Sequence, residues 1–171
     1  MRAPPVPTRE FALRLCLACI LAGVAHQFQW IQLRLLTSQL VLILSGMLGM
    51  GAERAAFDTI AVQGHAIQFT VACTFVEAML GMQPLIWRIG MSLSRNLMRM
   101  FISMILLFAC NILRIEAAQI LFGMGVSWTL AHDVPLGFLY FAAWVVVWRT
   151  RTWRALHDAT ARYAPISNES A

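Results

Sequence analysis

Long blocks of apolar residues run through this chain, and charged residues are concentrated between the blocks. The blocks lie at about residues 11–30, 35–52, 70–87, 97–113, 117–131 and 135–148. A helix needs about 20 residues to cross the hydrocarbon of a bilayer, and the pattern predicts an all-α polytopic membrane protein with about five or six transmembrane helices. Block 117–131 is short, which is compatible with a tilted span, a re-entrant segment or a helix on the surface.

The segment 53–72 is more polar than the blocks around it. From Ile67 to Val71, apolar and polar residues alternate with the period of a β-strand. Gln63-Gly64 is suited to the turn of a hairpin. We therefore expect a short β-hairpin outside the membrane, on the extracytoplasmic side, directly before the helix that carries Cys73.

The composition supports a membrane protein, because 60% of the residues are hydrophobic and only 12% are charged. A soluble domain of this size needs more polar residues to cover its surface. We expect one integral membrane domain over residues 1–151, in contact with the lipid bilayer, and a polar tail over residues 152–171. The net charge of +5 does not indicate a nucleic-acid partner, since the arginines flank apolar blocks.

Two groups of arginines mark the helix ends that the positive-inside rule assigns to the cytoplasm. They are residues 88, 95 and 99, and residues 149, 151 and 154. This orientation brings Cys73, Arg114 and His132 to the extracytoplasmic face. If successive blocks cross the membrane in alternate directions, the first two blocks put the N-terminus outside. This conflicts with Arg9 and Arg14, because the positive-inside rule assigns basic helix ends to the cytoplasm.

The four cysteines, at positions 16, 19, 73 and 110, do not form a disulfide framework. Cys16 and Cys19 lie within an apolar block without a second pair or a nearby histidine. We interpret them as buried, small hydrophobic residues rather than as a redox or metal site. No metal cluster, phosphate loop or dinucleotide fingerprint is present in the sequence, so we expect no metal and no cofactor.

Three short motifs carry a resemblance to a known family. They read A-C-T-F at 72–75, N-I-L-R-I at 111–115 and H-D-V-P-L-G at 132–137. In their order and spacing they resemble motifs of the exosortase/archaeosortase family, over about residues 55–150. Thr74 and Phe75 stand where that family usually has Ser and Gly, and the chain is shorter than typical members.

The resemblance implies a membrane cysteine protease/transpeptidase of a bacterial cytoplasmic membrane, with its active site on the extracytoplasmic side. Its substrates would be membrane-anchored proteins with a C-terminal sorting tail, made of a signature, a transmembrane helix and a basic cluster. Cys73 would be the nucleophile, His132 would carry the proton, and Arg114 would stabilise the oxyanion or align the substrate. The protein would then be transferred to a surface acceptor that the resemblance does not identify.

Three further residues are candidates for supporting roles. Asn111 shares a helical face with Arg114 and could hold the guanidinium or the substrate backbone. Glu77, one helical turn beyond Cys73, could pair with Arg114 or stay protonated and packed. For Asp133 we favour a structural role as the N-cap of a helix that follows it.

Two other classes of protein compete with the enzyme. A non-catalytic membrane subunit could bind tail helices or an exopolysaccharide export system, but it would have no need for the Cys/Arg/His set. A small transporter would place ionisable groups near the middle of the bilayer and would show internal repeats. No repeat is evident in the sequence, and the three candidate residues lie near the ends of apolar blocks.

Overall fold

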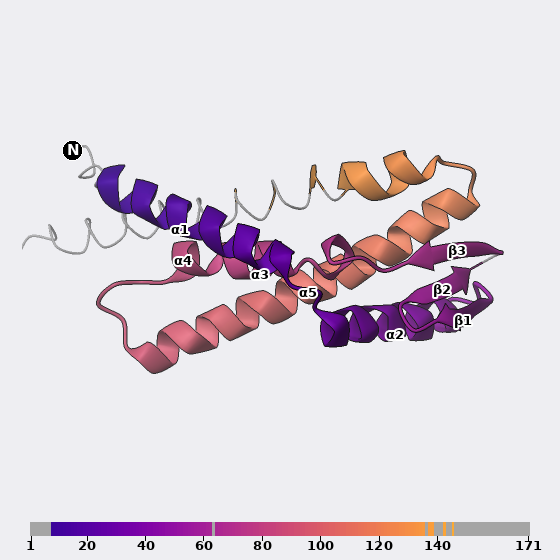
Figure 1. The fold of residues 1–171 in the computed structure, drawn as a ribbon, viewed down its shortest axis with the longest axis horizontal. Coiled ribbons are helices and arrows are strands. Elements are labelled where there is room, and N and C mark those ends of the chain that lie inside the picture. The colour runs from indigo at the N-terminus through magenta and orange to yellow at the C-terminus, as the bar shows by residue number, and fades with distance from the viewer. Residues whose placement is uncertain (1–7, 63, 136, 139–141, 143–144, 146–171) are drawn as a thin grey trace, which may run out of the picture.

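The computed structural model describes residues 8–62, 64–135, 137–138, 142 and 145. Five α-helices, one 3-10 helix and three strands are assigned within these residues (Figure 1). In chain order they are α1 (Thr8–Gln27), α2 (Ile31–Met47), β1 (Ala52–Ala56), β2 (Thr59–Val62), β3 (His65–Gln68), η1 (Ala72–Thr74), α3 (Val76–Gly81), α4 (Gln83–Ile86) and α5 (Leu93–Gly123). Residues 128–135 are also helical.

The strands form one antiparallel sheet in the order β1-β2-β3. The predicted hairpin is present as β2 and β3, with Val62 opposite His65 and Gly64 at φ +81° between them. That positive φ is one that glycine adopts without steric cost. The sheet is larger than expected, because β1 pairs with the other side of β2.

The prediction of five or six transmembrane helices is wrong for the residues that the structure describes. Two helices there, Arg9–Gln27 and Leu93–Gly123, are long and apolar enough to cross a membrane. Most of block 35–52 lies in α2, a helix of 17 residues that leads into the sheet. Block 117–131 is the end of α5 followed by a turn at Gly125 (φ +89°). Most of block 135–148, and the tail 152–171, lie outside the described residues.

Block 70–87 does not form one helix because its backbone is interrupted. Phe75 has a left-handed conformation (φ 61°, ψ 15°), which ends η1 before α3 begins. Pro84 then stands in the first turn of α4, where its missing N–H breaks no helical hydrogen bond. Hydropathy registers the apolar side chains of this block but not these changes of direction.

Helix α1 packs along α3 and α4 through small residues (Figure 1). A Cβ atom added to Gly81 would lie 3.2 Å from the carbonyl oxygen of Ala18 and 3.3 Å from the Cβ of Ala22. Gly81 therefore allows the two backbones to approach closely. At the start of α1, Arg14 donates hydrogen bonds to the carbonyls of Pro84 (3.2 Å) and Trp87 (2.5 Å).

These contacts place the start of α1 at the same end of the molecule as Arg88 and the start of α5 (Figure 1). The arginines at the N-terminus and those around α5 therefore share one end. The alternation of six blocks had placed them at opposite ends.

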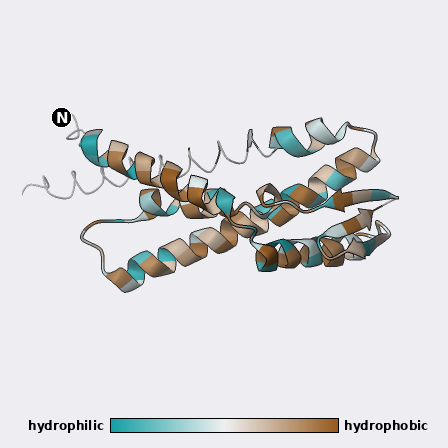
Figure 2. Ribbon diagram, viewed as in Figure 1, coloured by the Kyte–Doolittle hydropathy of each residue, from teal (hydrophilic) through white to brown (hydrophobic). Residues whose placement is uncertain are grey.

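The long helices carry their apolar side chains outward, and Figure 2 shows hydrophobic residues along both α1 and α5. On α5, large apolar residues such as Phe101, Ile105 and Leu113 are exposed, whereas Asn111 and Arg114 are buried. This arrangement is the reverse of a soluble surface and suits an apolar surrounding. The compact apolar core consists of Val41, Ile60, Val62, Phe69, Cys73, Ile112 and Ile115.

Candidate active site around Cys73

Cys73 lies in the 3-10 turn η1, between the sheet and α3, and it is 9% exposed. Its N–H donates to the carbonyl of Thr70 (3.1 Å), and the Thr70 hydroxyl lies 3.6 Å from the Cys73 Sγ. The buried Thr74 hydroxyl donates to the carbonyl of Val71 (2.6 Å) and so braces the same turn. The thiol is thus held by a short, internally hydrogen-bonded segment.

Helix α5 holds this segment from the other side through Asn111 and Arg114. The Asn111 amide donates to the backbone carbonyl of Cys73 (2.7 Å), and Arg114 Nε donates to the Asn111 amide oxygen (3.2 Å). Both side chains are buried, and they share a helical face because they are three residues apart. Of the two expected roles for Asn111, holding the guanidinium is the one present in the structure.

His132 approaches from the helical residues 128–135. Its backbone carbonyl accepts a hydrogen bond from Arg114 Nη1 (3.2 Å), and its Nδ1 lies 2.9 Å from Asp133 Oδ1. The Trp128 ring stacks on the imidazole, with the centroids 5.0 Å apart and the planes inclined by 17°. Arg114 therefore connects the helix of His132 to the turn of Cys73 through Asn111.

The Cys73 thiol and the His132 imidazole lie close enough to shift each other's pKa. Burial raises the pKa of the Cys73 thiol, but the interactions with His132 and Thr70 outweigh burial, so the pKa is lowered overall. The interaction with Cys73 raises the pKa of His132, with help from Asp133 and against burial and the charge of Arg114. Both directions favour a thiolate beside an imidazolium, which is the reactive form of a cysteine nucleophile.

The structure brings Cys73, Asn111, Arg114, His132 and Asp133 into one cluster. Asp133 is not the N-cap that we favoured, because the helix already begins at residue 128. Its carboxylate instead faces the imidazole of its neighbour.

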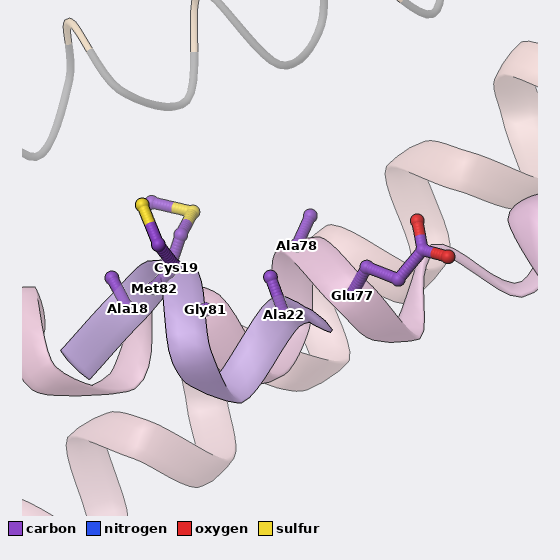
Figure 3. A pocket seen from close by; sticks show the side chains of 7 residues that line it. All are labelled: Ala18, Cys19, Ala22, Glu77, Ala78, Gly81 and Met82. Atoms are coloured by element: carbon purple, nitrogen blue, oxygen red, sulfur yellow. The ribbon is translucent and has the colours of Figure 1, made fainter. Parts of the chain in front are cut away.

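Glu77 faces α1 instead of this cluster. Its carboxylate pairs with His26 at the end of α1 (2.6 Å). It also lines a cavity of about 220 Å³ between α1 and α3, whose other lining residues are Ala18, Cys19, Ala22, Ala78, Gly81 and Met82 (Figure 3). Glu77 therefore connects two helices, and its partner is His26 rather than Arg114, which was one of the two alternatives considered.

Two other cysteines differ from expectation. Cys16 and Cys19 are exposed rather than buried, Cys110 is exposed as well, and Cys73 is the buried one of the four. Within the described part of the chain, no three His, Cys, Asp or Glu side chains gather as a metal site. The chemistry that we can derive is that of the side chains themselves.

Three residues that hold or contact the site were not identified from the sequence. Thr70 lay in the polar–apolar alternation without a role of its own, and Trp128 was given no role. Arg34 was given none either, but its Nε donates to the carbonyl of Phe69 (2.8 Å) and it forms an ion pair with Asp58. Trp128 lies four residues before His132, a spacing that brings side chains together on a helix and could have drawn attention to it.

No family model matches the chain, and no curated protein or solved structure is significantly similar to it. The function is therefore inferred from the geometry of the site together with the resemblance of its motifs.

Proposed function

We propose that this protein is a membrane-embedded cysteine protease/transpeptidase of exosortase type, which cleaves C-terminal sorting tails of membrane-anchored proteins. The observation that carries the proposal is that Asn111 and Arg114 hold the backbone of Cys73 and of His132, so that the thiol and the imidazole lie close enough to shift each other's pKa. A thiol kept only for packing needs neither a basic partner nor such a scaffold.

The reaction begins when the Cys73 thiolate attacks the carbonyl carbon of the scissile peptide bond, so that a C–S bond forms. The negative charge that develops on the carbonyl oxygen is stabilised by the nearby Arg114 guanidinium. His132 gives its proton to the leaving nitrogen as the C–N bond breaks, which releases the tail as a free amine. The remaining protein is held on Cys73 as a thioester.

The second half of the reaction resolves this thioester. An amine or hydroxyl group of the acceptor attacks the thioester carbonyl and loses its proton to His132, and the C–S bond breaks to regenerate the thiolate. Water in place of the acceptor makes the same enzyme a plain protease. Asp133 contributes by orienting the imidazole and stabilising its charged form.

The proposed location is a bacterial cytoplasmic membrane, with the active site on the extracytoplasmic side. Arg14, Arg88 and Arg95 lie toward one end of the molecule, and the positive-inside rule assigns that end to the cytoplasm. Asn111 and Arg114 lie four to five helical turns further along α5, toward the opposite end. The tail helix of the substrate would lie against the apolar outer faces of α1 and α5.

The test is a substrate-processing assay with a candidate sorting-tail protein encoded in the same genome. Co-expressed wild type should convert the substrate to a shorter form on a gel, and Cys16→Ala should do the same. Cys73→Ala and Cys73→Ser should leave the substrate uncleaved. If Cys73→Ala still processes the tail, while deletion of the whole chain abolishes processing, the nucleophile assignment is wrong and a non-catalytic, tail-binding subunit becomes the better description.

A further inference from the structure

Strand β3 lies at an edge of the sheet that the described strands form, and part of its backbone faces outward from that edge. The Phe69 N–H donates to the Asp58 carbonyl (2.8 Å), so this pair is hydrogen-bonded across the strands. Hydrogen-bonded and non-bonded pairs alternate in an antiparallel ladder, and the register therefore directs the N–H and C=O groups of Ala66 and Gln68 away from β2. No described strand pairs with this side.

A cavity of about 260 Å³ lies along this edge. All four residues of β3 line it, from His65 to Gln68, together with Phe122 and Trp128. Successive side chains of a strand point to opposite faces, so a pocket on one face would contact only every second residue. Contact with four consecutive residues indicates a groove that follows the strand edge itself.

The groove shares a wall with the active site. His65 packs edge-on against Phe122 with centroids 4.8 Å apart, and Phe122 packs against Trp128 at 5.6 Å. Trp128 in turn stacks on His132. The last residue of β3 is five residues before Cys73, which an extended chain spans in at most about 18 Å. A molecule in the groove would therefore be separated from His132 by the Trp128 ring, and it would lie within a few residues' length of Cys73.

We propose that the outer edge of β3 binds an extended segment of the protein substrate as a fourth strand and so delivers its scissile carbonyl to Cys73. This inference rests on the proposed function and specifies how that site recognises its substrate. Ala66 and Gln68 offer two donors and two acceptors to the main chain of any extended peptide, and the ring of Trp128 contacts its side chains. A helix has no free main-chain groups to pair with the edge, so cleavage falls in an extended stretch outside the tail helix.

The test uses purified full-length protein in detergent micelles, with Cys16, Cys19 and Cys110 changed to Ala so that Cys73 is the only thiol. Two reagents alkylate it: iodoacetamide, and an acetylated tetrapeptide of alternating alanine and valine that ends in a vinyl sulfone. Ala66→Pro and Gln68→Pro each remove one outward N–H, which an edge strand tolerates. Ala66→Ser and Gln68→Ala are matched controls that keep the N–H.

Each proline variant should slow alkylation by the peptide about tenfold, as expected for a lost hydrogen bond, and leave the iodoacetamide rate unchanged. The controls should behave as the parent protein. On the unsubstituted edge, peptides N-methylated at one alternate set of amides should react more slowly than peptides methylated at the other set, since only one set faces β3. This second comparison needs no variant of the strand, so it decides the matter even where a proline variant fails to fold.

The inference would be overturned if the peptide alkylates the proline variants as fast as the parent protein and if the two methylated peptides react at equal rates. The proposed function is judged separately by iodoacetamide. If His132→Ala leaves the iodoacetamide rate of Cys73 unchanged, the activated thiol is absent and the proposed function fails, whatever the peptides show.

Discussion

The Asn111 side chain donates a hydrogen bond of 2.7 Å to the backbone carbonyl of Cys73. A residue in the second half of the longest helix thus fixes the main chain of a cysteine that is 38 positions earlier. The same amide accepts a hydrogen bond from Arg114, whose Nη1 holds the carbonyl of His132. The relative position of the Cys73 thiol and the His132 imidazole therefore depends on the side chains of Asn111 and Arg114.

Asn111→Ala should lower processing of the substrate and destabilise the fold. The change leaves the Cys73 carbonyl and the Arg114 Nε without this partner in a buried place, at a cost of about 1–3 kcal/mol. Substrate processing on a gel and thermal unfolding in detergent measure the two effects. Leu113→Ala, at an exposed position on the same helix, is the matched control and should leave processing as in wild type.

Arg114→Lys should abolish most of the activity although it keeps the charge. A lysine ammonium is a single point and cannot reach both the Asn111 oxygen and the His132 carbonyl in the fork geometry of a guanidinium. The rate of Cys73 alkylation by iodoacetamide shows whether the loss of activity comes from a less reactive thiol or from a later effect on the substrate. If Arg114→Lys processes substrate at the wild-type rate, the guanidinium is not the connection between the two reactive residues.

The pH dependence of Cys73 alkylation should report the thiol–imidazole pair. The pKa of the Cys73 thiol is lowered, so the rate should rise with pH at values below the ordinary thiol pKa of about 8.5. In His132→Ala the interaction that lowers the pKa is lost and burial, which raises the pKa, stays. The rise should then move to higher pH, and a curve that does not move would contradict the coupling between thiol and imidazole. The measurement uses the chain in which Cys73 is the only thiol.

The sequence was sufficient to predict that Cys73, Arg114 and His132 lie together, but not to predict how many helices are long and apolar enough to cross a membrane. Cys73, Arg114 and His132 were assigned to one face from the placement of arginines, and they lie in one cluster in the structure. The break at Phe75 could not be anticipated from its residue type, because a phenylalanine with φ 61° is rare. The motif of the resembling family has glycine at this place, and glycine adopts such a conformation without strain.

The supporting contacts were harder to foresee, because they depend on packing between distant segments. The role of Asp133 was misjudged because the N-cap residue of its helix is Ser127, immediately before residue 128, and the Ser127 carbonyl accepts a hydrogen bond from the Ala131 N–H (2.9 Å). For Glu77, one helical turn beyond Cys73, pairing with Arg114 or packing in the protonated form were the alternatives, yet its partner is His26, 51 positions away. A one-dimensional pattern gives the spacing within a helix, but it does not give the neighbour that a side chain meets across a helix pair.

Arg34 and Asp58 offer a test of how the Cys73 turn is held. They form an ion pair of low exposure, and Arg34 also donates to the carbonyl of Phe69, directly before Thr70. Asp58→Ala should destabilise the protein by about 3–5 kcal/mol, because it leaves a largely buried charge without its partner. The double change Arg34→Met with Asp58→Ala should unfold at a higher temperature than Asp58→Ala alone. Equal unfolding temperatures would show that the pair does not hold this turn.

The close packing of α1 on α3 can be tested with two helical glycines, one at the contact between the helices and one away from it. A side chain at Gly81, the last residue of α3, would press on the backbone oxygen of Ala18, which cannot move without shifting the whole of α1. A side chain at Gly23, within α1, meets nothing within 4 Å. Gly81→Val should therefore lower the unfolding temperature in detergent and weaken substrate processing, since α3 follows directly after the turn of Cys73. Gly23→Val should retain both, and an equal loss in the two variants would mean that the effect comes from valine in a helix rather than from the contact between α1 and α3.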